Sequence, residues 1–567
     1  MTPAHEPIDE LVQGFAQGRL TRRAFIVRMA ALGVSMGSIG AIIAACGGGS
    51  SPSAPKAART AAPFATGAPG GGKEVDSITI ALTADIQGFD YVVAYDLNTN
   101  PVMTQVCESL SRVMPDGSLV PALAESWEMS PDGKKYVYKI RKGVKFHDGT
   151  ELTAEDAAYS MNRNLDPAVG SYLAGLYSRV DKVEATGAYE LTVTMKMPEA
   201  VWKYTAAATA CSVASKAFIE KNGKDVGTEK VGIVGTGPYK FVSWQRGQQI
   251  VLERFDDYWN KDRALKIRKA TYKPIIDEQT IVQALGSGEI DFTFNLSGKS
   301  FVQCQGFNNV ELVTGPSFNV AYLGINTKKA PWSDKRVRQA IAYSLDRQGI
   351  LEACYANQGK AWVPPITDAQ WFTAPDVFQK AYDALPKYEK NLEKAKQLIK
   401  DAGAEGARGE VLVGNDYDVP AAIAIQDGAK QLGMTIDVKR LPQQEKFALE
   451  FSGEPRTFDM TITIWGSDWP DPAGNIQVPL YAPNVIQNLA QYDNPEVMRL
   501  IDAQGEELDP KKRAELITQA QAIIVDELPW IVLYQTWTLV AQNKRIGGYA
   551  LRPTYYNDSW LADLSGR

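Results

Sequence analysis

Residues 121–163 read PALAESWEMSPDGKKYVYKIRKGVKFHDGTELTAEDAAYSMNR, and this stretch decides the class of fold. Its middle, near 135–145, is rich in β-forming residues and predicts extended structure. Asp148 and Gly149 predict a turn. A helix is predicted at 153–164, because Thr153 can cap it and acidic side chains occupy its first turn. Strands followed by an amphipathic helix indicate a mixed α/β protein.

The same mixture of elements continues in both directions along the chain. Residues 77–82 predict a strand, and further helices are predicted at 333–354, 389–402 and 510–527. No repeat of fixed period is present, which disfavours solenoids and propellers. At 567 residues the chain exceeds the size at which one hydrophobic core keeps growing. We therefore expect at least two lobes with separate cores.

Composition narrows the class of function. The formal net charge of −6 gives no broad basic surface for phosphates, which argues against nucleic acid as a partner. Only His5 and His147 occur, so a histidine-based metal cluster is disfavoured and we expect no metal or other cofactor. A catalytic His147 would need a nucleophile and an orienting acid, and the sequence offers no sign of either. We interpret His147 as part of the scaffold.

The cysteines are scattered and show no metal-ligand spacing. They fit buried small apolar residues, or, in an oxidising compartment, disulfides. If Cys46 carries a lipid, the remaining four allow three pairings, and the sequence does not choose among them: Cys107, Cys211, Cys304 and Cys354.

The N-terminus has the layout of an export signal. Arg22 and Arg23 precede an apolar, glycine-rich run that ends with small residues before Cys46. The paired arginines favour the twin-arginine route over the general one. The end of the run resembles a bacterial lipobox, which implies that the Cys46 thiol carries a diacylglyceryl group. We predict a signal at 1–45 and a flexible, lipidated tether at 46–75, because the tether lacks large apolar residues.

Several ordered stretches of the body resemble family 5 of the bacterial extracellular solute-binding proteins, the dipeptide- and oligopeptide-binding group. The likeness covers nearly the whole chain after the signal. It rests on the opening stretch and on these further landmarks: Val234–Tyr239, Trp244, Tyr258–Trp259, Leu323–Thr327, Pro331–Trp332, Asp334–Ala340 and Ala342–Arg347.

This resemblance implies the periplasmic-binding-protein fold, an α/β architecture of two lobes joined by hinge strands. Lobe I would comprise residues 76–318, with an extra subdomain at about 117–234, and a return segment at 537–567. Lobe II would comprise residues 319–536. Closure of the lobes around a solute would create the shape that an importer recognises.

The densest candidate for a ligand site is the loop at 465–472, because it follows the strand-like stretch 459–464. Tryptophans offer apolar walls there, and a carboxylate between them can take an ammonium group. By resemblance to the peptide-binding members, Asp468 receives the α-amino group of the ligand and Trp465 walls a side-chain pocket. The other candidate ligand residues are Gly466, Ser467, Trp469, Asp471, Tyr322 and Tyr534. The alternative is that Asp468 and Asp471 build a turn and that the aromatic rings are core.

The resemblance thus implies a monomeric binding component of an ABC importer, lipid-anchored on the outer face of the cytoplasmic membrane. Its partners would be the permease subunits and a small solute, with a peptide favoured. An oligosaccharide, an opine or a metal chelate is the alternative solute, because family members also carry these. An exported hydrolase that uses Asp468 and Asp471 as a carboxylate pair is the alternative of another class. We expect no enzymatic activity.

Overall fold

The structure is a computed structural model that describes residues 72–294, 296–452, 455–467, 469–483, 487–552 and 557–567. The predicted export signal with Arg22 and Arg23, the lipidated Cys46 and nearly all of the tether lie outside these residues, and so does Asp468. The chain divides into two compact units, Met1–Ala62 and Pro63–Arg567, and every described residue belongs to the second. None of the helices described there is both long enough and apolar enough to cross a membrane.

Eleven of the described strands form one mixed sheet. In spatial order these are β15 (Thr435–Arg440), β14 (Arg408–Val413), β16 (Met460–Trp465), β12 (Val310–Ile325), β17 (Trp530–Asn543), β11 (Phe292–Phe294), β1 (Val75–Leu82), β10 (Ile267–Pro274), β9 (Gln249–Arg254) and β8 (Tyr239–Gln245), with β13 (Gly359–Ala361) paired to β17. Parallel pairs such as β1 with β10 and β14 with β15 occur beside antiparallel ones. The mixed α/β class is therefore confirmed.

Helices pack around both halves of this sheet. Those after β12 are α10 (Lys335–Ser344), α11 (Arg347–Tyr355), α12 (Pro375–Ala384), α13 (Leu392–Ala402), α14 (Val419–Gln431), α15 (Gln443–Glu450), α16 (Gly474–Gln477), α17 (Pro495–Glu506) and α18 (Pro510–Glu527). Those before it are α4 (Thr99–Met103), α7 (Lys216–Asn222), α8 (Glu278–Ser287) and α9 (Gly298–Gln303).

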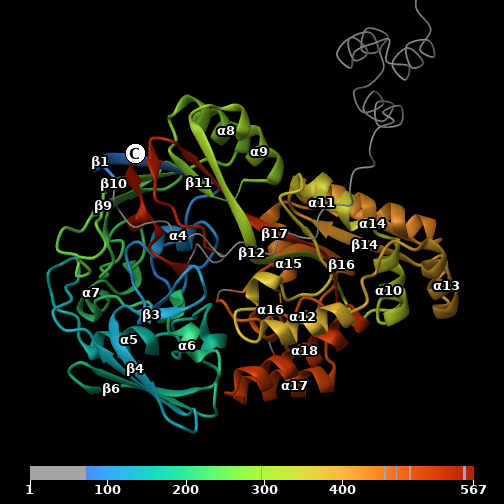
Figure 1. The fold of residues 1–567 in the computed structure, drawn as a ribbon, viewed down its shortest axis with the longest axis horizontal. Helices are drawn as coiled ribbons and strands as arrows, with labels where there is room; N and C mark the ends of the chain where they lie inside the picture. Colours follow the sequence, from blue (N-terminus) through green and yellow to red (C-terminus); the bar gives the residue numbers. More distant parts are fainter. Residues whose placement is uncertain (1–71, 295, 453–454, 468, 484–486, 553–556) are drawn as a thin grey trace, which may run out of the picture. The chain divides into compact units, whose positions relative to one another are not determined.

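Strands β12 and β17 run beside each other and reach both halves of the molecule (Figure 1). Their pairing shifts register between Pro316 and Val320. Before the shift, Val310 packs in a hydrophobic core shared with β1 and α8. After it, Ala321 packs in a different core, shared with α10 and β14. The two strands therefore connect two separately packed halves.

A smaller sheet forms a region with its own core. Its strands are β4 (Ala124–Met129), β5 (Lys135–Ile140), β7 (Glu190–Met195) and β6 (Val180–Gly187), in that order, and α5 (Ala154–Asn162) and α6 (Trp202–Thr205) belong to the same region. The core contains Leu123, Tyr138, Met161 and Trp202. We call residues 110–213 the small-sheet region. It begins with the hairpin of β2 (Ser111–Val113) and β3 (Leu119–Pro121).

Most of the predicted elements are confirmed. The strand expected at 77–82 is β1, and the helices expected at 153–164, 389–402 and 510–527 are α5, α13 and α18. The prediction of one helix at 333–354 is wrong. It is interrupted after Ser344, because Asp346 takes extended backbone angles and its carboxylate accepts the Gly349 N–H at 3.0 Å, which starts α11.

The histidine and cysteine side chains have structural surroundings. His147 Nε2 donates to the carbonyl of Gly237 at 2.9 Å, and its ring meets the edge of Phe255. Desolvation lowers the pKa of His147 to about 4, so the ring is neutral at pH 7. These contacts agree with the interpretation of His147 as part of the scaffold. The four cysteines described by the structure are buried free thiols, so none of the three possible pairings is formed.

Candidate functional site

The loop predicted to bind the ligand begins where β16 ends. β16 pairs with β12, so Trp465 lies opposite Val320, next to the register shift. Trp465 is half-buried, and its Nε1 donates to the carbonyl of Gly474 at 3.4 Å. Gly466 lies so close to Asn319 that an added Cβ would overlap the amide oxygen of that side chain. The loop therefore leaves the sheet where β12 passes from one core to the other.

Local hydrogen bonds hold the first turn of this loop. The hydroxyl of Ser467 donates to the carbonyl of Trp469 at 2.8 Å and accepts from the Trp469 N–H at 3.3 Å. Trp469 is only 3% exposed and packs against Val201 and Tyr204 of the small-sheet region. The indole thus joins this loop to the small-sheet region.

Asp471 forms a buried ion pair. Both of its oxygens accept from Arg513, with Nη1 to Oδ2 at 2.6 Å and Nη2 to Oδ1 at 2.8 Å. Oδ1 also accepts the N–H of Ala473 at 2.9 Å. Desolvation opposes the charge on Arg513, but the Asp471 carboxylate nevertheless raises the pKa of that guanidinium. The pair ties the loop to the first turn of α18.

The two tyrosines among the candidate ligand residues are buried in the interior of the second half. Tyr322 on β12 is 1% exposed and stacks on Trp530, with ring centroids 3.6 Å apart. Tyr534 on β17 is also 1% exposed and lies beside Tyr355. The structure therefore brings the described residues of the 465–472 loop together but places both tyrosines in the packed interior.

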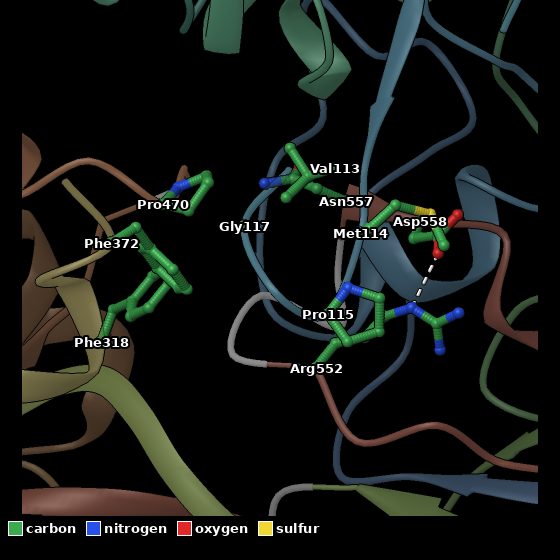
Figure 2. Close-up of a pocket in the computed structure, with 10 residues that line it drawn as sticks. All are labelled: Val113, Met114, Pro115, Gly117, Phe318, Phe372, Pro470, Arg552, Asn557 and Asp558. Carbon is green, nitrogen blue, oxygen red and sulfur yellow. Dashed lines mark ion pairs between the residues drawn. The ribbon is translucent and has the colours of Figure 1, made fainter. Parts of the chain in front are cut away.

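A narrow crevice opens beside the loop and separates two groups of residues. Figure 2 shows Phe318, Phe372 and Pro470 on one side. The other side carries Arg552 and the β2–β3 turn, represented by Val113, Met114 and Pro115. The free space is about 10 Å³, which is room for one water molecule. The crevice is therefore nearly closed in this structure.

Arg552 is the cation of this crevice, and it is neutralised. Its Nε pairs with Asp558 at 2.7 Å, and its Nη2 pairs with Asp563. The Asp563 carboxylate is itself desolvated, yet Arg552 and Arg263 lower its pKa to about 2. Because two carboxylates of the same C-terminal segment already neutralise the guanidinium, Arg552 holds that segment folded on itself beside the crevice.

Sequence reasoning missed most of the residues that line this crevice. The β2–β3 turn carried a usable signal, because Asp116-Gly117 between two short strands is a typical hairpin turn. Phe372 and Arg552 carried none, since each lies far along the chain from the others. No group of three or more His, Cys, Asp or Glu side chains suited to a metal ion occurs among the described residues.

The chain is similar to known proteins in sequence and in fold. The sequence model described as bacterial extracellular solute-binding proteins, family 5 Middle, matches residues 118–486. The glutathione-binding protein GsiB of Escherichia coli O1:K1 is 26% identical over 487 residues, which cover 84% of this chain and 92% of GsiB.

Two solved structures share the fold. The ABC transporter-associated periplasmic binding protein DppA from Helicobacter pylori, in complex with the peptide STSA, superposes with a TM-score of 0.78 at 23% identity, over 87% of this chain and 98% of DppA. AgaA from A. tumefacien R10, in complex with agropinic acid, gives 0.76 at 24% identity, over 87% and 99%. The described chain therefore has the two-lobed fold of periplasmic binding proteins.

Proposed function

The chain belongs to family 5 of the bacterial extracellular solute-binding proteins, and from this premise we propose that it captures a peptide-like solute between its lobes for an ABC importer. The proposal rests on the position of the loop at the end of β16. This loop lines a crevice between the two halves of the molecule, which β12 and β17 connect. A relative named for glutathione and a structural neighbour bound to the peptide STSA favour peptides. The neighbour bound to agropinic acid keeps an opine as the alternative.

We propose the lobe boundaries expected from the sequence. Lobe I comprises 76–318 and 537–567, with an extra subdomain at about 117–234, and lobe II comprises 319–536. The change of core along β12 and β17 supports these boundaries, because it falls at the same positions. The separate core of the small-sheet region supports the extra subdomain. Hinge motion at the register shift would then open and close the crevice.

Within the loop, Asp468 is proposed to receive the amino group of the ligand. Asp471 is committed to Arg513, so the ammonium of the ligand is assigned to the other acid. Trp465 is proposed as a wall of the pocket, with Gly466, Ser467 and Trp469 shaping it. Tyr322 and Tyr534 are proposed to support the pocket without touching the ligand, because their rings are buried in the core.

The experiment is thermal unfolding of the purified full-length protein in detergent, with free di- to pentapeptides and their N-acetylated forms. Ligand at about a thousand times its dissociation constant adds roughly 4 kcal/mol of stability, which is a shift of a few degrees. We expect the shift with free peptides to vanish on acetylation and in Asp468→Ala. A shift only with sugars, opines or metal chelates would refute peptide binding while keeping solute capture.

The ion pair between Asp471 and Arg513 also argues against a hydrolase that uses Asp468 and Asp471 as a carboxylate pair. A base or nucleophile needs free lone pairs, and this carboxylate accepts three hydrogen bonds, two of them from Arg513. Reversible capture, with no bond made or broken, remains the proposed chemistry. Recovery of every probe unchanged, measured by mass spectrometry after incubation with the protein, is the expected result.

We further propose export by the twin-arginine route, lipid attachment at Cys46, and a monomer that meets the permease at the outer face of the cytoplasmic membrane. The layout of residues 1–46 supports this placement. Two acyl chains hold a protein stably on a bilayer. Cys46→Ala should move the protein from the membrane pellet to the soluble fraction, whereas Cys304→Ala, which replaces a buried thiol, should leave it in the pellet. Equal membrane retention of both variants would contradict lipidation.

A further inference from the structure

A second cavity lies between the small-sheet region and lobe II. It has a free volume of about 220 Å³, and it shares no lining residue with the crevice of Figure 2. The small-sheet region contributes Trp127, Tyr136, Lys203 and Tyr204, and lobe II contributes Leu508 and the Asp471–Arg513 pair. Both halves of the molecule therefore build this cavity.

Close contacts join the two halves beside the cavity. The N–H of Ala200 donates to the carbonyl of Gly505 at 2.8 Å. Arg179 Nη2 pairs with Asp502 of α17 at 3.3 Å, and its guanidinium lies over Gly505. Because both halves supply its walls, the cavity in this form exists only while these contacts hold. A molecule inside it would bind the closed arrangement better than an open one, and so would favour closure.

The walls of the cavity are mainly aromatic and aliphatic. Tyr136 and Tyr204 are buried, Trp127 is half-buried, and Leu508 adds an aliphatic surface. Aromatic walls with a few polar groups are typical of small-molecule sites. The volume is below that of a site for a drug-sized compound, so it fits a small occupant with one ring or one branched chain.

One positive charge in the cavity, that of Lys203, has no direct ion pair among the described residues, although the Asp471 carboxylate attracts it from farther away. Arg513 is neutralised by Asp471 and also donates to the Gln504 side chain at 2.7 Å. Lys203 is exposed, and among the described residues no carboxylate oxygen lies within 4.0 Å of its ammonium. The structure places that ammonium over the ring of Tyr204, 5.1 Å from the centroid. An apolar cavity with a single unpaired ammonium favours an anionic occupant.

We propose that this cavity is a second ligand site, which takes a small organic anion with an aromatic or branched apolar body. The carboxylate of the ligand pairs with Lys203, and its body lies against Trp127, Tyr136 and Tyr204. The proposal does not depend on which solute the crevice takes. The ligand of this cavity would bind when the two halves are in the closed arrangement.

The test is isothermal titration of the full-length protein in detergent with 3-phenylpropionate, the neutral 3-phenylpropan-1-ol and the cationic 3-phenylpropylamine. We expect saturable binding of the acid, at least tenfold tighter than the alcohol, and no binding of the amine. No saturable binding of the acid, or equal affinity for acid and alcohol, would overturn the proposal. This comparison needs no variant, so it stands whatever a substitution does to folding.

Variants then locate the site. Lys203→Met should weaken binding of the acid at least tenfold, Lys203→Arg should retain it, and Lys224→Met, at another exposed lysine, should leave it unchanged. Asp468→Ala should also leave it unchanged, which separates this site from the proposed peptide site. Binding that persists in Lys203→Met, or that is lost in Asp468→Ala, would place the acid elsewhere and refute the second site.

Discussion

At the scale of single residues, Asp471 and Arg513 show how a residue expected at a ligand site can serve the scaffold. The pair is buried, with side-chain exposures of 3% and 9%. Removing one partner of such a pair leaves an uncompensated buried charge, which costs about 3–5 kcal/mol. We predict that Asp471→Ala lowers the unfolding free energy by that amount in urea titrations.

Two comparisons make this prediction specific. Glu496→Gln breaks an exposed pair with Arg499 and should cost less than about 1 kcal/mol. The double replacement of Asp471 by Leu and Arg513 by Met should cost less than Asp471→Ala alone, since no charge is left buried. A wild-type-like stability of Asp471→Ala would show that the carboxylate is free to meet a ligand.

Glu199 gives the second residue-scale prediction. It is 6% exposed, and its Oε2 accepts from Arg179 at 3.1 Å. Burial raises the pKa of Glu199 to about 7, although Arg179 opposes the rise. The folded state thus holds a proton that the unfolded state releases near pH 4.5, so stability is full below that pH and falls as pH rises to 7.

Glu199→Gln should remove this slope. Between pH 4.5 and 7 the wild type should lose roughly 3 kcal/mol relative to the variant, as 1.4 kcal/mol for each pH unit implies. Urea titrations at pH 5, 6, 7 and 8 measure the difference, with the exposed Glu184→Gln as control. Parallel curves for wild type and Glu199→Gln would contradict a buried, protonated Glu199.

At the scale of elements, the segment that leads into β8 depends on glycine for close packing. A Cβ on Gly235 would lie 2.1 Å from the carbonyl oxygen of Val106, so the backbone would have to move. We predict that Gly235→Ala costs about 1–3 kcal/mol, the usual range for overpacking, or more. Gly175→Ala is the matched control, because a Cβ there meets nothing within 4 Å. Equal melting temperatures of the two variants would refute this account.

Helices and strands with strong local sequence signals were predictable, and the one exception is the helix expected at 333–354. Helix α5 has Thr153 at its N-cap, as expected, and forms a capping box in which the N–H of Thr153 donates to Asp156 at 3.0 Å. The prediction of one helix at 333–354 was wrong because the apolar periodicity of the sequence continues across Leu345. The signal that breaks it is Asp346, a residue type that starts helices, and it stood inside an otherwise helical pattern.

At the scale of the whole molecule, the family signature predicted the two-lobed fold, but the crevice could not be predicted from the sequence. Its walls come from residues near 115, 318, 372, 470 and 552, which only the tertiary structure brings together. For the same reason the sequence did not indicate which residue pairs with Asp471. Its partner Arg513 lies 42 positions away on α18.

The central claim is reversible capture by closure of two lobes, and distance measurement between the lobes tests it most directly. Lys224→Cys and Glu393→Cys place one label on each lobe at exposed positions, while the four native thiols described by the structure are buried. Fluorescence energy transfer is followed while a defined peptide mixture is added, and the mixture is then analysed by mass spectrometry. The account predicts that the two labels approach each other saturably and that every peptide is recovered intact. Peptide cleavage, or peptide binding with no change in the label distance, would contradict it.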